Sequence, residues 1–371
     1  MSRFAFIHRY GLVVFLSGVF VFPWKLEAVE VTTLYEIAIP VTGQGAEERH
    51  RAIRQAFAEV LIRASGDRDV PGQPALQEAF VDTLSYVQQY RYHKLSRDGL
   101  EPADEAQPSL ELRVVFDARA VNQLLFNTGN PVWGRARPTT LVWLAVQEQT
   151  RRFLVGGDTG RAFQEEITRQ ARRRGIPVLF PLMDLEDQAA LHFTDVWGNF
   201  RDSIVAASRR YQSEAILAGR LYRRQDGEWE GRWTLYSDAE PRFWSASAES
   251  LATVVAAGID SSADSLARRF AQRAGGVAGQ RVLLSVSAVH ELKDYARVLG
   301  YLESIDAVER LQVARIEGDK VLFRLNLRGD GKGLRQAIAF GGALAPEIGM
   351  DGAAPGMDRQ HEAVLTYRLL Q

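Results

Sequence analysis

The C-terminal quarter of the sequence constrains the fold most, because strand-like and helix-like stretches alternate there in a regular order. Runs of apolar and β-branched residues predict strands, and apolar residues spaced three and four apart predict helices. The expected elements are a strand at 281–289, a helix at 290–305, a hairpin at 308–329 that turns at Gly318-Asp319, a helix at 331–342 and a strand at 362–370. This βαββαβ order is that of a ferredoxin-like domain.

Residues 43–70, GQGAEERHRAIRQAFAEVLIRASGDRDV, raise the question of a reactive site because Arg49, His50 and Arg51 stand together. The apolar residues of the stretch, however, follow the i, i+3, i+4, i+7 spacing of an amphipathic helix. Gly66 lies where a left-handed residue would end that helix. The stretch is therefore predicted to be a helix with one face on a sheet, and the Arg-His-Arg cluster is predicted to lie on the polar side of its first turns.

Two joints rich in glycine and proline divide the chain. The stretch TGNPVWGRARP at 128–138 predicts a linker, and Gly275-Gly276 marks a second boundary. Each segment between these joints contains both strand and helix patterns, at a length that suits a domain of about 100 residues. We therefore expect an α+β protein of three small α/β-sandwich-type domains, the last of them ferredoxin-like. Their predicted bounds are 29–127, 139–275 and 280–371.

Residues 1–28 have the layout of a secretory signal peptide. A basic stretch from Arg3 to Arg9 precedes an apolar run at 11–22, and Ala28 is the last residue expected to be removed. Such a run is shorter than the roughly 18 residues that a membrane-spanning helix needs. The absence of cysteine agrees with export to an oxidising compartment. We expect a periplasmic protein with no transmembrane segment after the signal peptide; an uncleaved inner-membrane anchor is the alternative.

The signal peptide is joined by two further distinctive stretches, YEIAIPV…AIRQAFAEVLIRASGD near the N-terminus and LKDYARVLGYLESIDAVERLQVARIEGDKVLFRL near the C-terminus. Together they resemble an uncharacterised proteobacterial family of exported proteins, a domain of unknown function. The resemblance covers nearly the whole mature chain and implies a Gram-negative envelope location. It implies no catalytic residues, because no activity is established for the family. The element order of the middle segment is also similar to that of small periplasmic domains of envelope assembly machines.

The charge balance gives no basis for nucleic-acid binding. The chain has 45 Lys and Arg against 46 Asp and Glu, a formal net charge of −1, whereas a nucleic-acid-binding domain is typically strongly basic. In the predicted C-terminal hairpin, the outward residues Arg324, Asn326 and Arg328 include no aromatic ring on which a base could stack. No nucleic-acid partner is therefore expected.

No motif indicates a cofactor, a metal or a catalytic residue. None of the 6 histidines has another at the i, i+4 spacing of a helical metal pair, and thiolate ligands are absent. GGDTGR at 156–161 stands where a phosphate loop would, but it lacks the required Lys and hydroxyl. We interpret Asp158 or Thr159 as the cap of the following helix, and the ARRRG run at 171–175 as a solvated helix end.

The candidate binding site is the hairpin at 215–236, which Asp226-Gly227 is predicted to turn. If that turn has two residues, Arg224 faces Trp229 and Arg220 faces Trp233. Interleaved Arg and Trp side chains can engage a glycan, a lipid headgroup or a protein partner, and an exposed Arg over a Trp gains roughly 0.5–1 kcal/mol. The alternative is a set of ordinary cross-strand pairs buried under the long helix that follows. The candidate residues are Arg220, Tyr222, Arg224, Trp229 and Trp233.

These observations favour an exported, non-enzymatic binding or assembly protein of the Gram-negative cell envelope. Its expected partner is an envelope protein, or a surface glycan or lipid headgroup. The alternative is an envelope hydrolase that acts on glycan or peptidoglycan, with a site between the second and third domains. That alternative predicts that Asp184, Glu186, His192 and Arg220 converge in one cleft.

Overall fold

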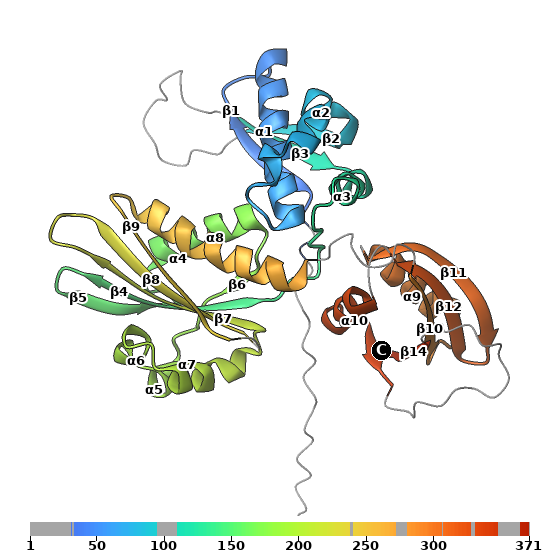
Figure 1. Ribbon diagram of the computed structural model, residues 1–371. Helices are drawn as coiled ribbons and strands as arrows, with labels where there is room; N and C mark the ends of the chain where they lie inside the picture. Colours follow the sequence, from blue (N-terminus) through green and yellow to red (C-terminus); the bar gives the residue numbers. More distant parts are fainter. Residues whose placement is uncertain are drawn as a thin grey trace, which may run out of the picture.

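Figure 1 shows the computed structural model, an α+β protein with three separate β-sheets. The predicted signal peptide, Arg328 and the joint at Gly275-Gly276 lie outside the described residues. Those residues are 31, 33–94, 110–237, 240–271, 280–305, 307–327, 331–347 and 364–370. Over these ranges, every helix is too short or too polar to cross a membrane.

One face of the N-terminal sheet packs on α1. Its elements, and the short helices beside them, are β1 (Glu36–Val41), α1 (Ala46–Ser65), η1 (Val70–Gly72), η2 (Pro74–Leu76), α2 (Gln77–Val81), η3 (Thr83–Tyr86), β2 (Val87–Lys94), β3 (Leu110–Phe116) and α3 (Ala118–Asn127). The strand order is β1-β3-β2, antiparallel throughout. In β1, Ile37, Ile39 and Val41 are buried and alternate with outward residues, as one-sided packing requires.

Helix α1 begins and ends close to where the sequence predicts. Its buried residues include Ile53 and Phe57, which lie on the apolar stripe. Gly66 ends the helix in the left-handed conformation, with φ of 75°, and its N–H donates to the carbonyl of Ile62. His50 is exposed. The stretch that resembles a reactive site is therefore a helix packed on a sheet.

The central sheet lies between two layers of helices (Figure 1), with α4 and α8 on one face and α5, α6 and α7 on the other. Its strand order is β5-β4-β7-β8-β9, and β6 pairs with β4. The elements are β4 (Thr140–Glu148), β5 (Arg151–Val155), α4 (Arg161–Arg174), β6 (Val178–Leu179), α5 (Leu185–Ala190), α6 (Phe193–Trp197), α7 (Arg201–Ser208), η4 (Arg209–Tyr211), β7 (Ala215–Arg223), β8 (Trp229–Tyr236), β9 (Arg242–Ala248) and α8 (Leu251–Phe270). Because helices cover both faces of β4, its first seven residues are all buried.

The central part differs from the sequence prediction at both edges of its sheet. Strands β5 and β9 were not predicted. The sequence pattern of residues 195–211 predicts one helix, whereas the structure has three short ones in this region, α6, α7 and η4. The edge strand β9 has the sequence RFWSASA, in which exposed residues alternate with half-buried ones. Such a polar, short strand carries a weak signal, since only one of its faces contributes to a core.

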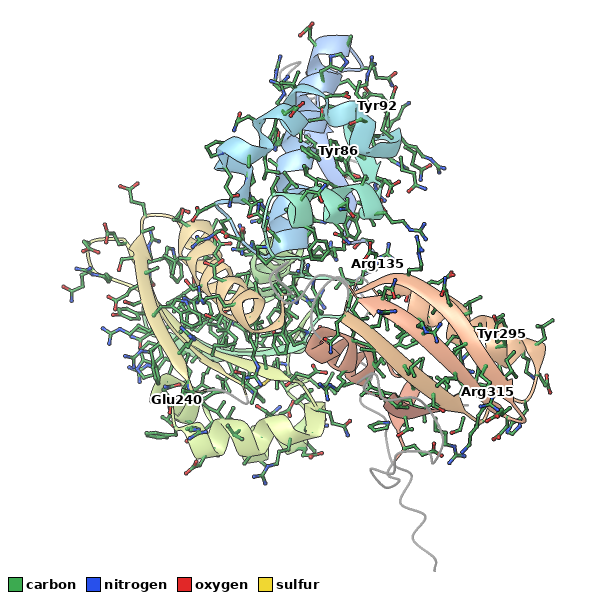
Figure 2. All side chains as sticks on the ribbon, turned by 45° about the vertical axis from the view of Figure 1, so that its right-hand side comes forward. Tyr86, Tyr92, Arg135, Glu240, Tyr295 and Arg315 are labelled. Atoms are coloured by element: carbon green, nitrogen blue, oxygen red, sulfur yellow. The ribbon has the colours of Figure 1, made fainter. Side chains whose placement is uncertain are left out.

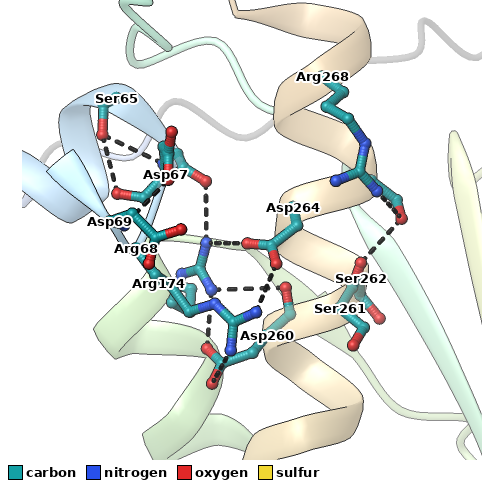
Figure 3. Close-up of polar contacts among 12 residues, drawn as sticks. Ser65, Asp67, Arg68, Asp69, Arg174, Asp260, Ser261, Ser262, Asp264 and Arg268 are labelled. Carbon is teal, nitrogen blue, oxygen red and sulfur yellow. Dashed lines mark hydrogen bonds and ion pairs between the residues drawn. The ribbon is translucent and has the colours of Figure 1, made fainter. Parts of the chain in front are cut away.

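Arg174 joins the central part to the N-terminal part (Figure 3). Its side chain, only 5% exposed, donates to Asp260 at 2.8 Å and to Asp264 at 2.7 Å, both on α8. It also donates to the carbonyl of Gly66, at 2.9 Å. The fully buried Arg137 adds a second link, because it donates to the carbonyls at the ends of both α1 and α4.

The prediction that the ARRRG run is a solvated helix end is wrong for one of its residues. Arg172 and Arg173 are exposed, as predicted, but Arg174 turns inward to the two carboxylates of α8. These acids lie far away in the sequence, so the local pattern gave no sign of them.

The C-terminal sheet has the strand order β11-β12-β10-β14-β13. Its elements are β10 (Gln280–Ser287), α9 (Leu292–Ser304), β11 (Val308–Glu317), β12 (Lys320–Leu327), α10 (Gly331–Phe340), β13 (Leu344–Pro346) and β14 (Val364–Leu369). Alternate residues of β12, from Val321 to Leu327, are buried in one core with α9 and α10, as predicted. The structure adds β13 to the predicted order, and the ferredoxin-like assignment stays a prediction.

Candidate functional site

The β7–β8 hairpin turns through three residues instead of the predicted two. Gly227 N–H donates to the Arg224 carbonyl at 3.0 Å, and Arg224 N–H donates to the Glu228 carbonyl at 2.7 Å. Gly227 has φ of 89°, the left-handed conformation that a three-residue hairpin loop requires at its bulge. The extra residue shifts the pairing of the two strands by one position.

This shift separates the predicted Arg–Trp pairs, because side chains of a strand point alternately to its two faces. Arg220 lies opposite Arg232, and Trp233 lies opposite Gly219. Trp229 pairs with Arg223, so the predicted pairings of Trp229 with Arg224 and of Trp233 with Arg220 are both wrong. Trp229 and Trp233 lie on one face of the sheet, whereas Arg220 and Tyr222 lie on the other.

The two tryptophans of β8 belong to the core beneath α8. Trp229 is 8% exposed and Trp233 is 1% exposed. Three glycines make room for the Trp233 indole, since a Cβ added at any of them would lie 2.9 Å or less from it: Gly219, Gly231 and Gly258. Trp229 and Trp233 are therefore not available as surface ligands.

The opposite face of the hairpin is the floor of an open pocket with a volume of about 450 Å³. We call it the β7–β9 pocket. Helices α5, α6 and α7 lie below β4 and β7 (Figure 1), and Tyr236 at the end of β8 packs beside them. The end of α6 forms the wall. The lining residues that matter below are Trp197, Arg220, Glu230, Arg232, Phe243 and Ser245.

Arg220 is held against the wall of the β7–β9 pocket. Its Nη1 donates to the Trp197 carbonyl at 2.8 Å, and its guanidinium lies 5.7 Å from the centroid of the Trp197 ring. Among the residues that the structure describes, no carboxylate forms an ion pair with Arg220. Because a guanidinium has five N–H donors, most of them remain available to a ligand.

Glu230, the acidic residue of the pocket, already has hydrogen-bond partners within the protein. Glu230 accepts a hydrogen bond from Arg232 Nε at 2.9 Å. The hydrogen bond from Tyr222, followed by that from Arg232, lowers the pKa of Glu230 below its ordinary value. Burial, followed by this contact with Glu230, raises the pKa of Tyr222. The carboxylate therefore balances Arg232, and Arg220 is left as an excess positive charge on the pocket floor.

The outer edge of the pocket is formed by β9. Phe243 is 67% exposed and lies opposite Thr234, on the same face as Arg220. β9 is also the last strand of the sheet. An exposed ring, a half-buried indole and an uncompensated guanidinium form a surface that fits a carboxylate or phosphate next to an apolar group.

The remaining predicted binding residue, Arg224, lies at the tip of the hairpin. It forms ion pairs with Asp226 at 3.1 Å and with Glu228 at 3.9 Å. Of the five candidates, the structure thus brings only Arg220 and Tyr222 to the pocket face. Trp233 borders the pocket as part of β8, but its indole points to the other side of the sheet.

The four residues that a hydrolase site would bring together lie in separate interactions. Asp184 and Glu186 form ion pairs with Arg210. His192 lies 3.5 Å from Asp195 within its own helix end, and Arg220 contacts Trp197. Within the described ranges, no group of three His, Asp or Glu residues is placed to hold a metal ion.

The GGDTGR stretch forms a tight turn before α4, and its predicted cap is wrong. The residue that precedes the helix is Gly160, with φ of 73°, and no side chain caps the helix there. The Asp158 carboxylate instead accepts a hydrogen bond from the Arg161 guanidinium, at 2.5 Å. The glycine takes the capping position because only its left-handed backbone fits the turn.

Trp197 and Phe243 were missed by the sequence analysis. The signal for Phe243 is the alternation in RFWSASA, which has the period of an edge strand. Trp197 carries no such signal, because its position beside Arg220 depends on how α6 packs across β7.

Comparison with known proteins finds a domain of unknown function in the N-terminal part of the chain. Residues 28–134 match a family model described as "Domain of unknown function (DUF8605)". No curated protein matches the chain. Among solved structures, it is similar to the LpoB C-terminal domain from Salmonella enterica, with 12% sequence identity and a TM-score of 0.23, over 30% of this chain and 83% of that chain. A TM-score this low supports no conclusion about fold or function.

Proposed function

We propose that this protein is an exported, non-enzymatic binding protein of the Gram-negative cell envelope. In this proposal, the β7–β9 pocket holds an acidic segment of an envelope protein. The location rests on the signal-peptide pattern of residues 1–28. The binding role rests on the geometry of the pocket.

One observation carries the binding role, the pairing of Arg220 with Arg232 across β7 and β8. Like charges directly opposite each other on one face destabilise a sheet. Glu230 compensates Arg232, but no carboxylate of the described residues compensates Arg220. A carboxylate from a partner would complete this arrangement, and the cost of the unpaired arrangement in the free protein argues for such a partner.

The surroundings of Arg220 favour a protein segment as the ligand. Trp, Tyr and Arg are the residues that dominate binding energy at protein interfaces, and Trp197, Tyr222 and Arg220 adjoin here. Tyr222 contacts Trp197, with ring centroids 5.8 Å apart. Beside the wall, Phe200 is a further exposed aromatic, at 56%.

The proposal is tested by photo-crosslinking in the protein's native cells. A photoreactive residue at position 243 of the full chain should capture one envelope protein. The captured band should weaken at least about tenfold when Arg220→Ala is added, since a charged hydrogen bond and its desolvated partner are lost. A photoreactive residue at Val81, which is 86% exposed on α2, serves as the control position.

Equal capture from both positions, or no capture at position 243, would overturn the binding role. Arg54→Ala, on the exposed face of α1, is the matched control substitution and should leave the band unchanged. If the purified chain released soluble fragments from peptidoglycan and Arg220→Ala abolished that release, the protein would be the hydrolase of the alternative prediction.

Export is tested separately by fractionating cells and measuring the mass of the mature chain by mass spectrometry. We expect the protein in the periplasmic fraction with Val29 as its first residue. Recovery of the full-length chain in the inner membrane would indicate an uncleaved anchor.

A further inference from the structure

Among the residues that the structure describes, no helix covers one face of the C-terminal sheet. Helices α9 and α10 pack on the face that carries Val282, Leu284 and Phe323. Cross-strand partners point to the same side, so the register identifies the residues of the other face. Arg324, for example, lies opposite Leu283 of β10 on one side and Gln312 of β11 on the other.

This open face is strongly basic. Residues 280–371 contain equal numbers of basic and acidic residues, so the charge of the face comes from where the residues are placed. Two acidic residues lie on this face or at its border, and both are already engaged. Glu317 forms an ion pair with Arg315, and Glu347 accepts a hydrogen bond from the Ser287 hydroxyl. The exposed basic residues of the face are Arg281, Arg310, Arg315, Lys320, Arg324 and Arg368; Figure 2 labels Arg315 on this sheet.

Three of these arginines have no acidic partner. Within the described part of the chain, Arg310, Arg324 and Arg368 form no ion pair with a carboxylate. They lie on three different strands, β11, β12 and β14. Their charge is therefore spread over the sheet and is not concentrated at one pocket.

Aliphatic side chains lie among these charges. Leu283 and Leu322 are half-buried on the open face, and Val364 is 56% exposed. The exposed surface thus combines basic groups with apolar groups that can enter the boundary between lipid headgroups and acyl chains.

We propose that this open face docks onto an anionic phospholipid surface. Four adjacent strands, each about 4.8 Å from the next, carry the basic residues and present a face about 15 Å wide. A flat, broad basic surface suits a flat array of anionic headgroups, for which each Lys or Arg near the surface adds to the attraction.

The composition of the face distinguishes this ligand from a protein or a nucleic acid. Its exposed residues in the described strands include no Trp, Tyr or Phe, the rings that anchor protein interfaces and stack with bases. The β7–β9 pocket, in contrast, has such rings at Trp197 and Phe243. The two surfaces are therefore suited to different partners.

The test is co-sedimentation of the purified mature chain with vesicles. Vesicles of equal parts phosphatidylcholine and phosphatidylglycerol should bind the chain, and phosphatidylcholine alone should not. Arg310→Glu with Arg324→Glu should weaken binding at least about tenfold, since two attractive charges become repulsive. The matched control, Arg51→Glu with Arg54→Glu on α1, makes the same charge change elsewhere and should bind like the unmodified chain.

Several outcomes would overturn the proposal. They are equal binding to neutral vesicles, equal loss in the α1 control, no binding to either vesicle, and binding of soluble polyglutamate or inorganic phosphate that prevents vesicle binding. Circular dichroism must show that the charge-reversed variants are folded. Val364→Ala, which keeps every charge and removes an exposed apolar side chain from the open face, provides a second variant and should weaken binding. Arg220→Ala should bind vesicles normally, so this result and the test of the β7–β9 pocket are independent.

Discussion

Arg174 and Asp264 form a buried ion pair in which Arg174 Nη2 and Asp264 Oδ1 are 2.7 Å apart. The pair joins the last residue of α4 to the middle of α8. Arg174 also reaches Gly66, the residue that ends α1 (Figure 3). One guanidinium therefore links three helices, and the N-terminal and central parts are held together through it.

We expect Arg174→Ala to destabilise the protein strongly. Removing one partner of a buried ion pair costs about 3–5 kcal/mol when the other charge is left without compensation. The cost is reduced here because Asp260 and Asp264 are 26% and 21% exposed and keep ion pairs with Arg68. Urea unfolding should show a loss of about 2–4 kcal/mol. Arg172→Ala, two residues earlier and exposed, should change the free energy of unfolding by less than about 0.5 kcal/mol. Similar losses in both variants would contradict the role of Arg174.

Replacing Gly258 of α8 with alanine should destabilise the protein, although alanine usually stabilises a helix. Alanine normally stabilises a helix relative to glycine by roughly 0.5–1 kcal/mol. At Gly258, however, a Cβ would lie 2.4 Å from the Trp233 indole, so Gly258→Ala should lower the free energy of unfolding by about 1–3 kcal/mol. At Gly300 in α9 nothing lies within 4 Å, and Gly300→Ala should raise it. Thermal or urea unfolding of both variants should show changes of opposite sign in the free energy of unfolding. A stabilised Gly258→Ala would show that the indole lies elsewhere.

The proposed role of Arg220 has a consequence for stability. If its repulsion from Arg232 is uncompensated, then Arg220→Gln should stabilise the free protein at low salt by up to about 1 kcal/mol while it weakens partner capture. Salt screens exposed charges, so the gain should shrink as salt is added. Loss of stability at every salt concentration would mean that the bond to Trp197 outweighs the repulsion.

The parts of the fold that follow local periodicity were predictable from the sequence. Helix α1 and the alternation of β12 lie where the pattern of apolar residues predicts them. The candidate site was predicted only in part, because its register depends on the single residue Gly227. That residue adopts a left-handed bulge, and the Asp-Gly sequence is compatible with both a two-residue and a three-residue loop.

Contacts between distant segments were not predictable. Arg174 looked like one of several solvated arginines, since its partners are 86 and 90 residues away. Trp197 gained its position from packing of α6 on β7, and a single sequence carries no record of that packing. The residues that define the pocket are thus those set by tertiary structure.

The last prediction concerns alkaline pH and Tyr211, whose hydroxyl donates to the buried carboxylate of Asp187. Burial, followed by this hydrogen bond, raises the pKa of Tyr211 to about 12. A raised pKa means that folding favours the neutral phenol, so this stability is present below about pH 10 and is lost as the pH rises towards 12. In Tyr211→Phe, the free energy of unfolding from urea titrations should be lower at neutral pH and should fall less steeply over that range. Tyr90→Phe, an exposed control at 43%, should keep the slope of the unmodified chain; an unchanged slope in Tyr211→Phe would contradict the assignment.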